Sequence, residues 1–469
     1  MKLEKAADAT IHKIFVQRIL RIILQSPARV SILGFATLIF VGAFLLMLPE
    51  ASMARRLGFV DALFTATSAT CVTGLVVVDT AHALSPLGQI VILILIQAGG
   101  LGIMTVSTLF LLMAGRKPSL VGSIVIQDTL THGAEQNVYS VLRDLALLTF
   151  VVEGLGAALM FIRFLPDYDA AHALYLAVFH SVSAFCNAGF SLFTDSLMAY
   201  RQDWVLNLVM CFLIVTGGIG FLVLSELKRQ FPFNRRIWSR LSLHSKLVLS
   251  TTAILLISSS LLIISMEWHN TLAPLSYLER CLAGFFQAVS ARTAGFNTIS
   301  IGDMANETLF FFILLMFVGA SPGSCGGGIK TTTLASLAVL GISRLRGQER
   351  PQLFRRSISE TSVGKAVSIV MISTIVVLVG TMLLLITELG EIAHTMTRGK
   401  FLELLFEVVS AFGTVGLSTG VTPGLSVAGK LIITIVMFVG RLGPLVIAIA
   451  VSRRSVRRYY YAEEHIMVG

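Results

Sequence analysis

Eight stretches of nearly uninterrupted apolar residues recur along the chain and are separated by shorter polar segments. About 20 helical residues cross a hydrocarbon layer of ~30 Å, and each stretch reaches or approaches that length. The pattern predicts eight transmembrane helices, over residues 30–48, 87–113, 145–165, 205–224, 247–266, 309–341, 367–386 and 431–451.

A shorter apolar stretch of about 10 to 12 residues, such as 173–184, lies between the two members of each pair of runs. It is too short to cross a membrane and is typical of a re-entrant segment. Backbone that ends inside a membrane is tolerated only where it is buried in protein or lines a water-filled path. The four short stretches therefore predict re-entrant helices that meet around one axis.

One motif ends each short stretch: Phe, three residues, Ser-Ala, and then a Gly followed by a bulky apolar residue. Its copies occupy 64–75, 179–190, 286–296 and 406–417. The Gly comes six residues after the Ser in three copies and five in the third. The copies are too widely spaced for a solenoid. They predict an all-α integral membrane fold with a pseudo-fourfold pore, built from four span, pore-helix, span repeats at 30–115, 140–230, 245–345 and 364–452.

Composition and charge agree with a membrane protein, since 55% of residues are hydrophobic and only 13% are charged. Most Lys and Arg residues precede the first run or follow the second, fourth, sixth and eighth. Cytoplasmic loops collect basic residues, so both termini are predicted to be cytoplasmic. This bias accounts for the net charge of +10 and leaves little support for nucleic-acid binding. The ends, 1–29 and 453–469, are expected to form an amphipathic helix and a cytoplasmic tail.

The motif glycines suggest ion chemistry. A ring of inward-facing carbonyl oxygens can replace the hydration shell of a cation, and Gly at the narrowest point adopts conformations closed to other residues. Close helix packing by Gly is the alternative, but it leaves the matching offsets of four copies unexplained. A selectivity filter is therefore predicted at Cys71, Val72, Thr73, Gly74, Cys186, Asn187, Ala188, Gly189, Arg292, Thr293, Ala294, Gly295, Gly413, Thr414, Val415 and Gly416.

A Gly-rich segment, residues 319–330, interrupts the sixth run. Each Gly costs ~1 kcal/mol and Pro ~3 kcal/mol in a helix relative to Ala, so the helix is predicted to break and its backbone to line the water path. A phosphate-binding loop is the competing interpretation. Against it, Ile329 separates the last Gly from Lys330, and no strand–loop–helix context surrounds the segment.

Several polar residues lie inside or beside the apolar runs. A charge such as Arg441 in the eighth run normally faces the bundle interior or a cavity, and a salt bridge to Glu153 of the third run is one possible arrangement. Asp61, His180, Gln287 and Glu407, on or beside the short helices, are expected to orient the filter. Asp79, just after the first filter segment, is a candidate for attracting cations at the outer mouth.

The four glycine segments, 71–75, 186–190, 292–296 and 413–417, resemble the degenerate filters of the Trk/Ktr/HKT superfamily of potassium transporters. The resemblance covers essentially the whole chain and is strongest to membrane subunits of bacterial Ktr uptake systems. It implies a channel-like pore in the bacterial inner membrane, with K⁺ as the transported ion at backbone carbonyls. It also implies Na⁺ as an activator and no organic cofactor on this chain. Each segment keeps a single Gly, unlike the Thr-Val-Gly-Tyr-Gly of channels.

The same resemblance implies a gate and partners. Arg441 would lie below the filter on the pore axis, and the partners would be a second copy of the chain and a cytosolic KtrA-type nucleotide-binding ring. Anionic lipid headgroups would also explain the basic loops. The implied intramembrane gate comprises Gly319, Gly323, Ser324, Cys325, Gly326, Gly327, Gly328, Lys330 and Arg441.

Other functional classes have less support. The histidines and the five cysteines show neither metal-ligand spacing nor a disulfide framework, and no catalytic constellation appears, so the chain is predicted not to be an enzyme. An alternating-access cation symporter is the stronger rival. Such carriers usually contain inverted repeats, whereas these four repeats share one topology.

Overall fold

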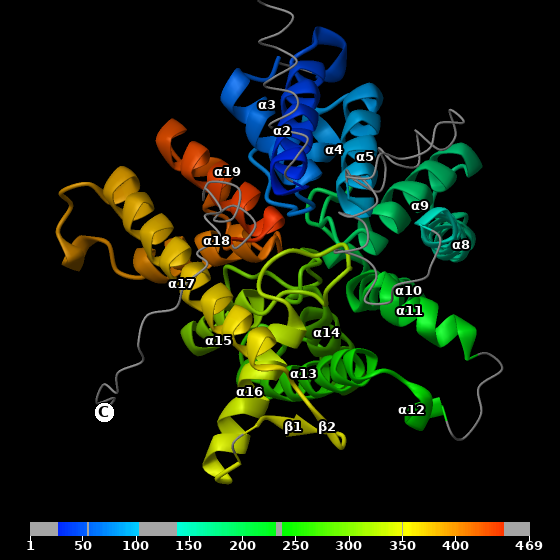
Figure 1. Ribbon diagram of the computed structural model, residues 1–469. Helices are drawn as coiled ribbons and strands as arrows, with labels where there is room; N and C mark the ends of the chain where they lie inside the picture. The colour runs from blue at the N-terminus through cyan, green and yellow to red at the C-terminus, as the bar shows by residue number, and fades with distance from the viewer. Residues whose placement is uncertain (1–26, 54–55, 103–137, 231–236, 349, 445–469) are drawn as a thin grey trace, which may run out of the picture.

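The structure is a computed structural model that describes residues 27–53, 56–102, 138–230, 237–348 and 350–444. It is mostly helical. In Figure 1, four groups of helices follow one another in chain order around a common centre, coloured from blue through green and yellow to orange. The predicted tail 453–469, nearly all of the amphipathic segment 1–29, and the ends of the second and eighth apolar runs lie outside the described residues.

The first two groups cover the amino-terminal half. The first contains α2 (Pro27–Leu46), η1 (Pro49–Ala51), α3 (Phe59–Thr70), α4 (Thr80–Ala83) and α5 (Pro86–Leu101). The second contains α8 (Val138–Phe164), α9 (Ala170–Phe185), η2 (Met198–Tyr200), α10 (Trp204–Ile219) and α11 (Phe221–Arg229).

The other two groups cover the carboxyl-terminal half. The third contains α12 (Ile237–Arg240), α13 (Leu243–Glu267), α14 (Tyr277–Ser290), α15 (Asn306–Phe317) and α16 (Thr331–Leu345), followed by a small hairpin of β1 (Gln352–Leu353) and antiparallel β2 (Arg356–Ser357). The fourth contains α17 (Glu360–Leu389), η3 (His394–Met396), α18 (Lys400–Gly413), η4 (Thr422–Gly424) and α19 (Val427–Leu442).

Four described helices, α2, α8, α13 and α17, are long and apolar enough to cross a membrane. The pair α10 and α11, bent by 98°, could form a fifth crossing. The described parts of the second and eighth runs, α5 and α19, are shorter, and the sixth run is divided into α15 and α16. The eight-span arrangement therefore remains a prediction, while the break in the sixth run occurs where its Gly and Pro residues lie.

The short helices α3, α9, α14 and α18 form the centre of the fold. The Phe that begins each motif copy is buried, at 1% exposure or less in all four. The long helices carry the opposite pattern, with large apolar side chains such as Phe44, Phe150, Leu261 and Leu378 about 60% exposed. An apolar outer surface over a buried centre is the arrangement expected of helices that face lipid.

Polar caps set where several helices begin. The Asp169 side chain accepts a hydrogen bond from His172 N at 3.2 Å at the start of α9, and Asp203 accepts one from Leu206 N at 2.9 Å at the start of α10. Such caps satisfy backbone donors that have no partner in the helix. They fix the starting points of α9 and α10, and hence where the short helix α9 ends near the centre.

Candidate functional site

The four short helices all end in the same unusual turn. In each turn, a single residue one to three positions after the last helical residue adopts the left-handed conformation, which is uncommon for a residue with a side chain. The motif Gly follows two residues later. The left-handed residues are Val72, Asn187, Thr293 and Thr414, with φ of 58°, 60°, 77° and 50°, and the glycines Gly74, Gly189, Gly295 and Gly416 have φ of 94°, 71°, 79° and 90°.

These glycines form a closed cycle, which we call the four-glycine ring. A Cβ atom built on Gly74 would lie 2.6 Å from the carbonyl oxygen of Ala188, closer than real contacts allow. The same holds from each repeat to the next. A Cβ on Gly189 would lie 3.0 Å from the carbonyl oxygen of Ala294, and a Cβ on Gly295 would lie 2.5 Å from that of Val415. A Cβ on Gly416 would collide with the carbonyl oxygen of Thr73. Glycine is therefore required at each position by its φ and by the neighbouring backbone.

The motif serines brace this ring. The Oγ atoms of Ser68 and Ser410 each accept a hydrogen bond from the ring glycine of their own copy, at 3.1 Å. Ser183 Oγ instead donates to the carbonyl of Phe190 at 2.7 Å, and Ser290 Oγ donates to that of Phe296. The constant Ser in the sequence pattern thus has a structural reason, since it holds the turn between helix and ring.

The third copy is one residue shorter than the others, and the turn accommodates the difference. In every copy the residue before the Gly donates its N–H to the carbonyl of the motif Ser, over 2.7–2.9 Å. This bond joins residues five apart in three copies, as in Thr73 to Ser68, but four apart in the third, from Ala294 to Ser290. The shorter turn brings Gly295 to the same place in the ring as the other three.

Three of the four residues expected to orient the filter contact the backbone or side chains just after the ring. His180 Nε2 contacts Ser191 Oγ at 3.1 Å, and Gln287 Nε2 donates to Thr298 Oγ1 at 3.4 Å. Glu407 accepts from Ser418 Oγ at 2.6 Å and Thr422 Oγ1 at 2.7 Å. Asp61 differs, because it pairs with Lys430 Nζ at 2.7 Å and so joins α3 to α19.

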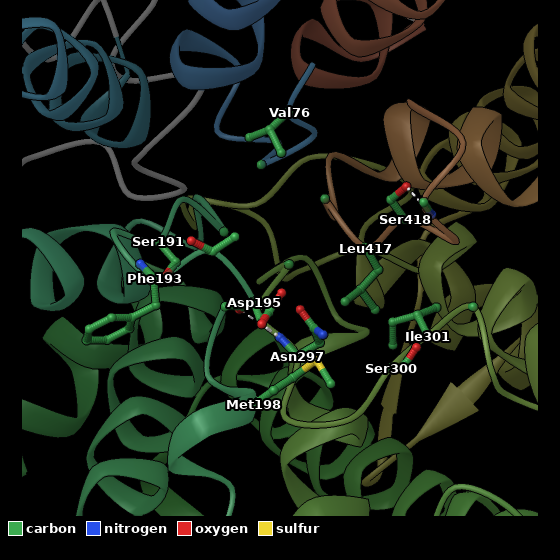
Figure 2. Close-up of a pocket in the computed structure, with 18 of the residues that line it drawn as sticks. Val76, Ser191, Phe193, Asp195, Met198, Asn297, Ser300, Ile301, Leu417 and Ser418 are labelled. Atoms are coloured by element: carbon green, nitrogen blue, oxygen red, sulfur yellow. Dashed lines mark hydrogen bonds between the residues drawn. The ribbon is translucent and has the colours of Figure 1, made fainter. Parts of the chain in front are cut away.

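A cavity of about 540 Å³, which we call the vestibule, opens on one face of the ring. All four ring glycines line it, together with the residues two positions after them, Val76, Ser191, Asn297 and Ser418 (Figure 2). Its lining includes three acidic residues, Asp79, Asp195 and Asp303, and none of the described residues that line it is basic. The vestibule therefore concentrates negative charge next to the ring.

Sequence reasoning identified only Asp79 of these three acids. Asp195 and Asp303 lie in loops without periodicity, where an acidic residue is ordinary. One signal could have found them, since Asp79, Asp195 and Asp303 stand five, six and eight residues after the ring glycine of their own copy. Only the folded chain places all three around one cavity.

The Gly-rich segment lies on the opposite face of the ring. Gly327 N donates to Thr414 Oγ1 at 2.8 Å, and Gly326 packs against the side chain of Thr293. Both threonines precede ring glycines, whereas the vestibule is lined by residues that follow them. The segment therefore packs on the side of the ring away from the vestibule.

Backbone bonds hold this segment against the broken end of α10. Ser321 N donates to Gly218 O at 3.0 Å and Phe221 N donates to Gly323 O at 2.9 Å. Within the segment, Gly319 N donates to Ile329 O at 2.8 Å and Ser324 Oγ donates to Ser321 O at 2.6 Å. Gly328 N also donates to Gly440 O of α19 at 3.4 Å. All nine residues of the predicted gate are thus close to one another.

Lys330 and Arg441 both donate to backbone carbonyls of this segment. Lys330 Nζ reaches Gly326 O at 2.5 Å and Gly327 O at 3.4 Å. Arg441 donates to Cys325 O and to Gly99 O of α5. The salt bridge considered between Arg441 and Glu153 is not formed, because Glu153 accepts instead from Gln97 Nε2 at 3.3 Å. Backbone carbonyls of the segment and of α5 thus take the place of an acidic partner for Arg441.

A second repeated feature was not predicted from the sequence. Helices α5, α10 and α19 all end at a Gly, and Gly102, Gly220 and Gly443 share φ of 81–96° and ψ of 131–142°. Each lies three residues after another Gly that packs closely on the end of a short helix, as Gly99 does on Thr70. In the third repeat, the Gly-rich segment follows the end of α15 at the corresponding position. Among the described residues, α5, α10 and α19 thus each end at such a Gly, and α15 ends where the Gly-rich segment begins.

Comparison with known proteins agrees with this geometry. The family model described as TrkH, cation transport protein, matches residues 27–457. The chain is 41% identical to Ktr system potassium uptake protein B of Bacillus subtilis, over 95% of this chain and 97% of that protein. It is 36% identical to the potassium/sodium uptake protein NtpJ of Enterococcus hirae, over 95% and 97% of the two chains.

A solved structure is also similar. The crystal structure of the potassium transporter TrkH from Vibrio parahaemolyticus superposes with a TM-score of 0.71 at 17% identity, covering 90% of this chain and 83% of that one. At such low identity the match speaks for the fold alone. The family model and the sequence relatives carry the assignment further, and the chain belongs to the TrkH family of cation transport proteins.

Proposed function

We propose that this protein takes up K⁺ across the bacterial inner membrane through the four-glycine ring. The observation that carries the proposal is the closed cycle in which each glycine lies against a carbonyl of the next repeat. Four backbone segments that converge in this way supply the oxygen ligands that a dehydrated cation needs. The printed names of the relatives, potassium uptake protein B and potassium/sodium uptake protein, support K⁺ as the cargo.

In this proposal the filter comprises the residues from Cys71 to Gly74 and their three counterparts, and the segment 319–330 is the gate. The segment packs on the threonines below the ring. Lys330 and Arg441 add two positive charges there, each bonded to segment carbonyls. Fixed positive charge on a cation path raises the barrier to passage. Opening then requires the segment and these side chains to move aside.

Uptake measured in cells tests the proposal directly. In a bacterial strain lacking its own potassium uptake systems, expression of the chain should restore growth at low external K⁺ and give K⁺ influx that exceeds Na⁺ influx. The same assay with and without added Na⁺ tests sodium as an activator. Cells that contain the chain in their membrane and yet gain no cation flux would contradict the transport function.

The vestibule provides a second, graded test. Asp195→Asn combined with Asp303→Asn is expected to raise the K⁺ concentration for half-maximal uptake by about threefold or more at low ionic strength, because a negative mouth concentrates cations. The difference should shrink in high salt, where the Debye length falls to ~3 Å at 1 M. Asp167→Asn is the matched control, since Asp167 is acidic and outside the vestibule lining. Equal concentration dependence at low salt would contradict a role in attracting cations.

We place both termini in the cytoplasm and propose two partners, a second copy of the chain and a cytosolic KtrA-type nucleotide-binding ring. The gate described above needs a driving element, and the Bacillus relative is named as part of a Ktr system. The purified chain should therefore have the mass of a dimer, and adding the nucleotide-binding partner should make flux respond to nucleotide. A monomer whose flux is full and does not respond to nucleotide would contradict both proposed partners.

A further inference from the structure

Arg292, in the third filter segment, is a buried charge with few partners. It lies two residues after the end of α14 and directly before the left-handed residue Thr293. Only 8% of it is exposed. Its Nε has no hydrogen-bond partner among the described residues, and its Nη2 donates to Thr252 Oγ1 of α13 over a long 3.5 Å. A guanidinium stays charged and carries five N–H donors. Burying a charge without full pairing is costly, so the arrangement calls for a functional reason.

The surroundings of Arg292 connect it to the predicted gate. Arg292 lines a small cavity of about 10 Å³ together with Thr252 of α13, Gly218 near the end of α10 and Ala320 of the Gly-rich segment. The guanidinium therefore lies where the end of a helix meets the segment.

The end of α10 is capped by that same segment. The last four carbonyls of an α-helix have no partner within the helix. In α10, Gly218 O accepts from Ser321 N at 3.0 Å and Gly217 O accepts from Cys325 N at 3.3 Å. An unpaired carbonyl at membrane depth costs free energy, so movement of the segment would leave these carbonyls in need of other donors.

We propose that Arg292 is a positioning residue for the open gate, because its spare N–H groups bond to the α10 carbonyls that the segment releases. The inference rests on the proposed function, in which the segment moves aside. Arg side chains at the carboxyl end of a helix can bond to its last carbonyls and interact favourably with its dipole. Arg292 and Gly218 border one cavity, so donor and acceptor are already neighbours.

This role is opposite in sign to that of the other two basic residues. Lys330 and Arg441 donate to carbonyls of the segment and hold it in place, whereas Arg292 stabilises the arrangement without it. Removing Arg292 therefore favours the closed state, while removing Arg441 favours the open one.

The test measures cation efflux from liposomes that contain the purified full chain. Arg292→Met should lower potassium efflux by about tenfold or more, because the open state loses a hydrogen bond from a charged donor. The ratio of K⁺ to Na⁺ flux should stay at the wild-type value, since the filter carbonyls are unchanged. Arg292→Lys keeps the charge with fewer donors and should lower efflux less. Thr252→Val is the matched control: it removes the bond to Arg292 Nη2 and should not lower efflux.

Several results would overturn the proposal. Higher efflux from Arg292→Met would mean that Arg292 opposes cation passage. A fall in the K⁺ to Na⁺ ratio would place its role in the filter, and an equal loss of efflux in Thr252→Val would make it a structural brace between α13 and α14. If Arg292→Met does not insert into the membrane, Arg292→Lys decides, and efflux at or above the wild-type level then contradicts the role.

Arg441→Met separates this inference from the proposed gate. It should raise efflux, and adding Arg292→Met should remove much of the gain. If Arg441→Met raises efflux and the double variant keeps the whole gain, the gate stands and the role of Arg292 is wrong. If neither Arg441→Met nor deletion of 324–328 raises efflux, the gate itself fails, and the role of Arg292 fails with it.

Discussion

Serine in place of any one ring glycine should lower the ratio of K⁺ to Na⁺ uptake by about tenfold or more, which equals roughly 1.4 kcal/mol of differential binding. All four glycines have φ between 71° and 94°, where a side chain is strained. The added Cβ would also collide with a carbonyl or Cα of the next repeat. Because the contacts form one cycle, a shift at any position deforms the whole ring. Potassium and sodium influx in the uptake-deficient strain measures the ratio.

The four variants should differ in severity. A Cβ on Gly189 would meet its nearest carbonyl at 3.0 Å, the loosest of the four, whereas Gly416 has the tightest contact. Gly189→Ser should therefore be the mildest variant and Gly416→Ser the most damaging. Gly58→Ser is the matched control, because Gly58 caps α3 at φ −65° with nothing within 4 Å of an added Cβ. Wild-type discrimination in all four ring variants would contradict the filter.

Deleting residues 324–328 should raise cation flux by a factor of about 10 to 1,000, the range expected if the open state holds 0.1–10% of molecules. The deletion removes the Gly327 bond to Thr414 and the carbonyls that hold Lys330 and Arg441. With these contacts gone, the segment loses its bond to Thr414, Lys330 loses its two carbonyl acceptors, and Arg441 keeps only its bond to Gly99 O. Potassium efflux from liposomes containing the purified variant measures the effect.

A second variant and a control accompany this deletion. Arg441→Met removes the charge and its bonds to Cys325 and Gly99 while keeping a long side chain, so it should raise flux in the same direction. Deleting 394–398 removes five residues from a largely exposed connection between α17 and α18 and should leave flux unchanged. If the variant without 324–328 inserts normally and conducts no faster, the segment is not the gate.

The sequence by itself determined the elements that depend on local pattern. Four copies of one motif predicted four related units, and the Gly that follows the motif Ser by five or six residues marked the ring, because the serine braces the turn within its own copy. The density of Gly and Pro at 319–330 determined the break between α15 and α16, since helix propensity acts over a few neighbouring residues. The family assignment, which the comparisons confirmed, rested on the same segments.

The tertiary structure decided every feature that needs residues from different repeats. Asp195 and Asp303 join Asp79 around the vestibule only after three loops fold together. Arg441 could be assigned a carboxylate partner from sequence, yet it bonds to Cys325 O and Gly99 O. Every residue carries a backbone carbonyl, so no pattern of side chains can show which carbonyls will meet a buried charge. The ring depends on the same groups, because each glycine lies against a carbonyl that only the folded chain brings to it.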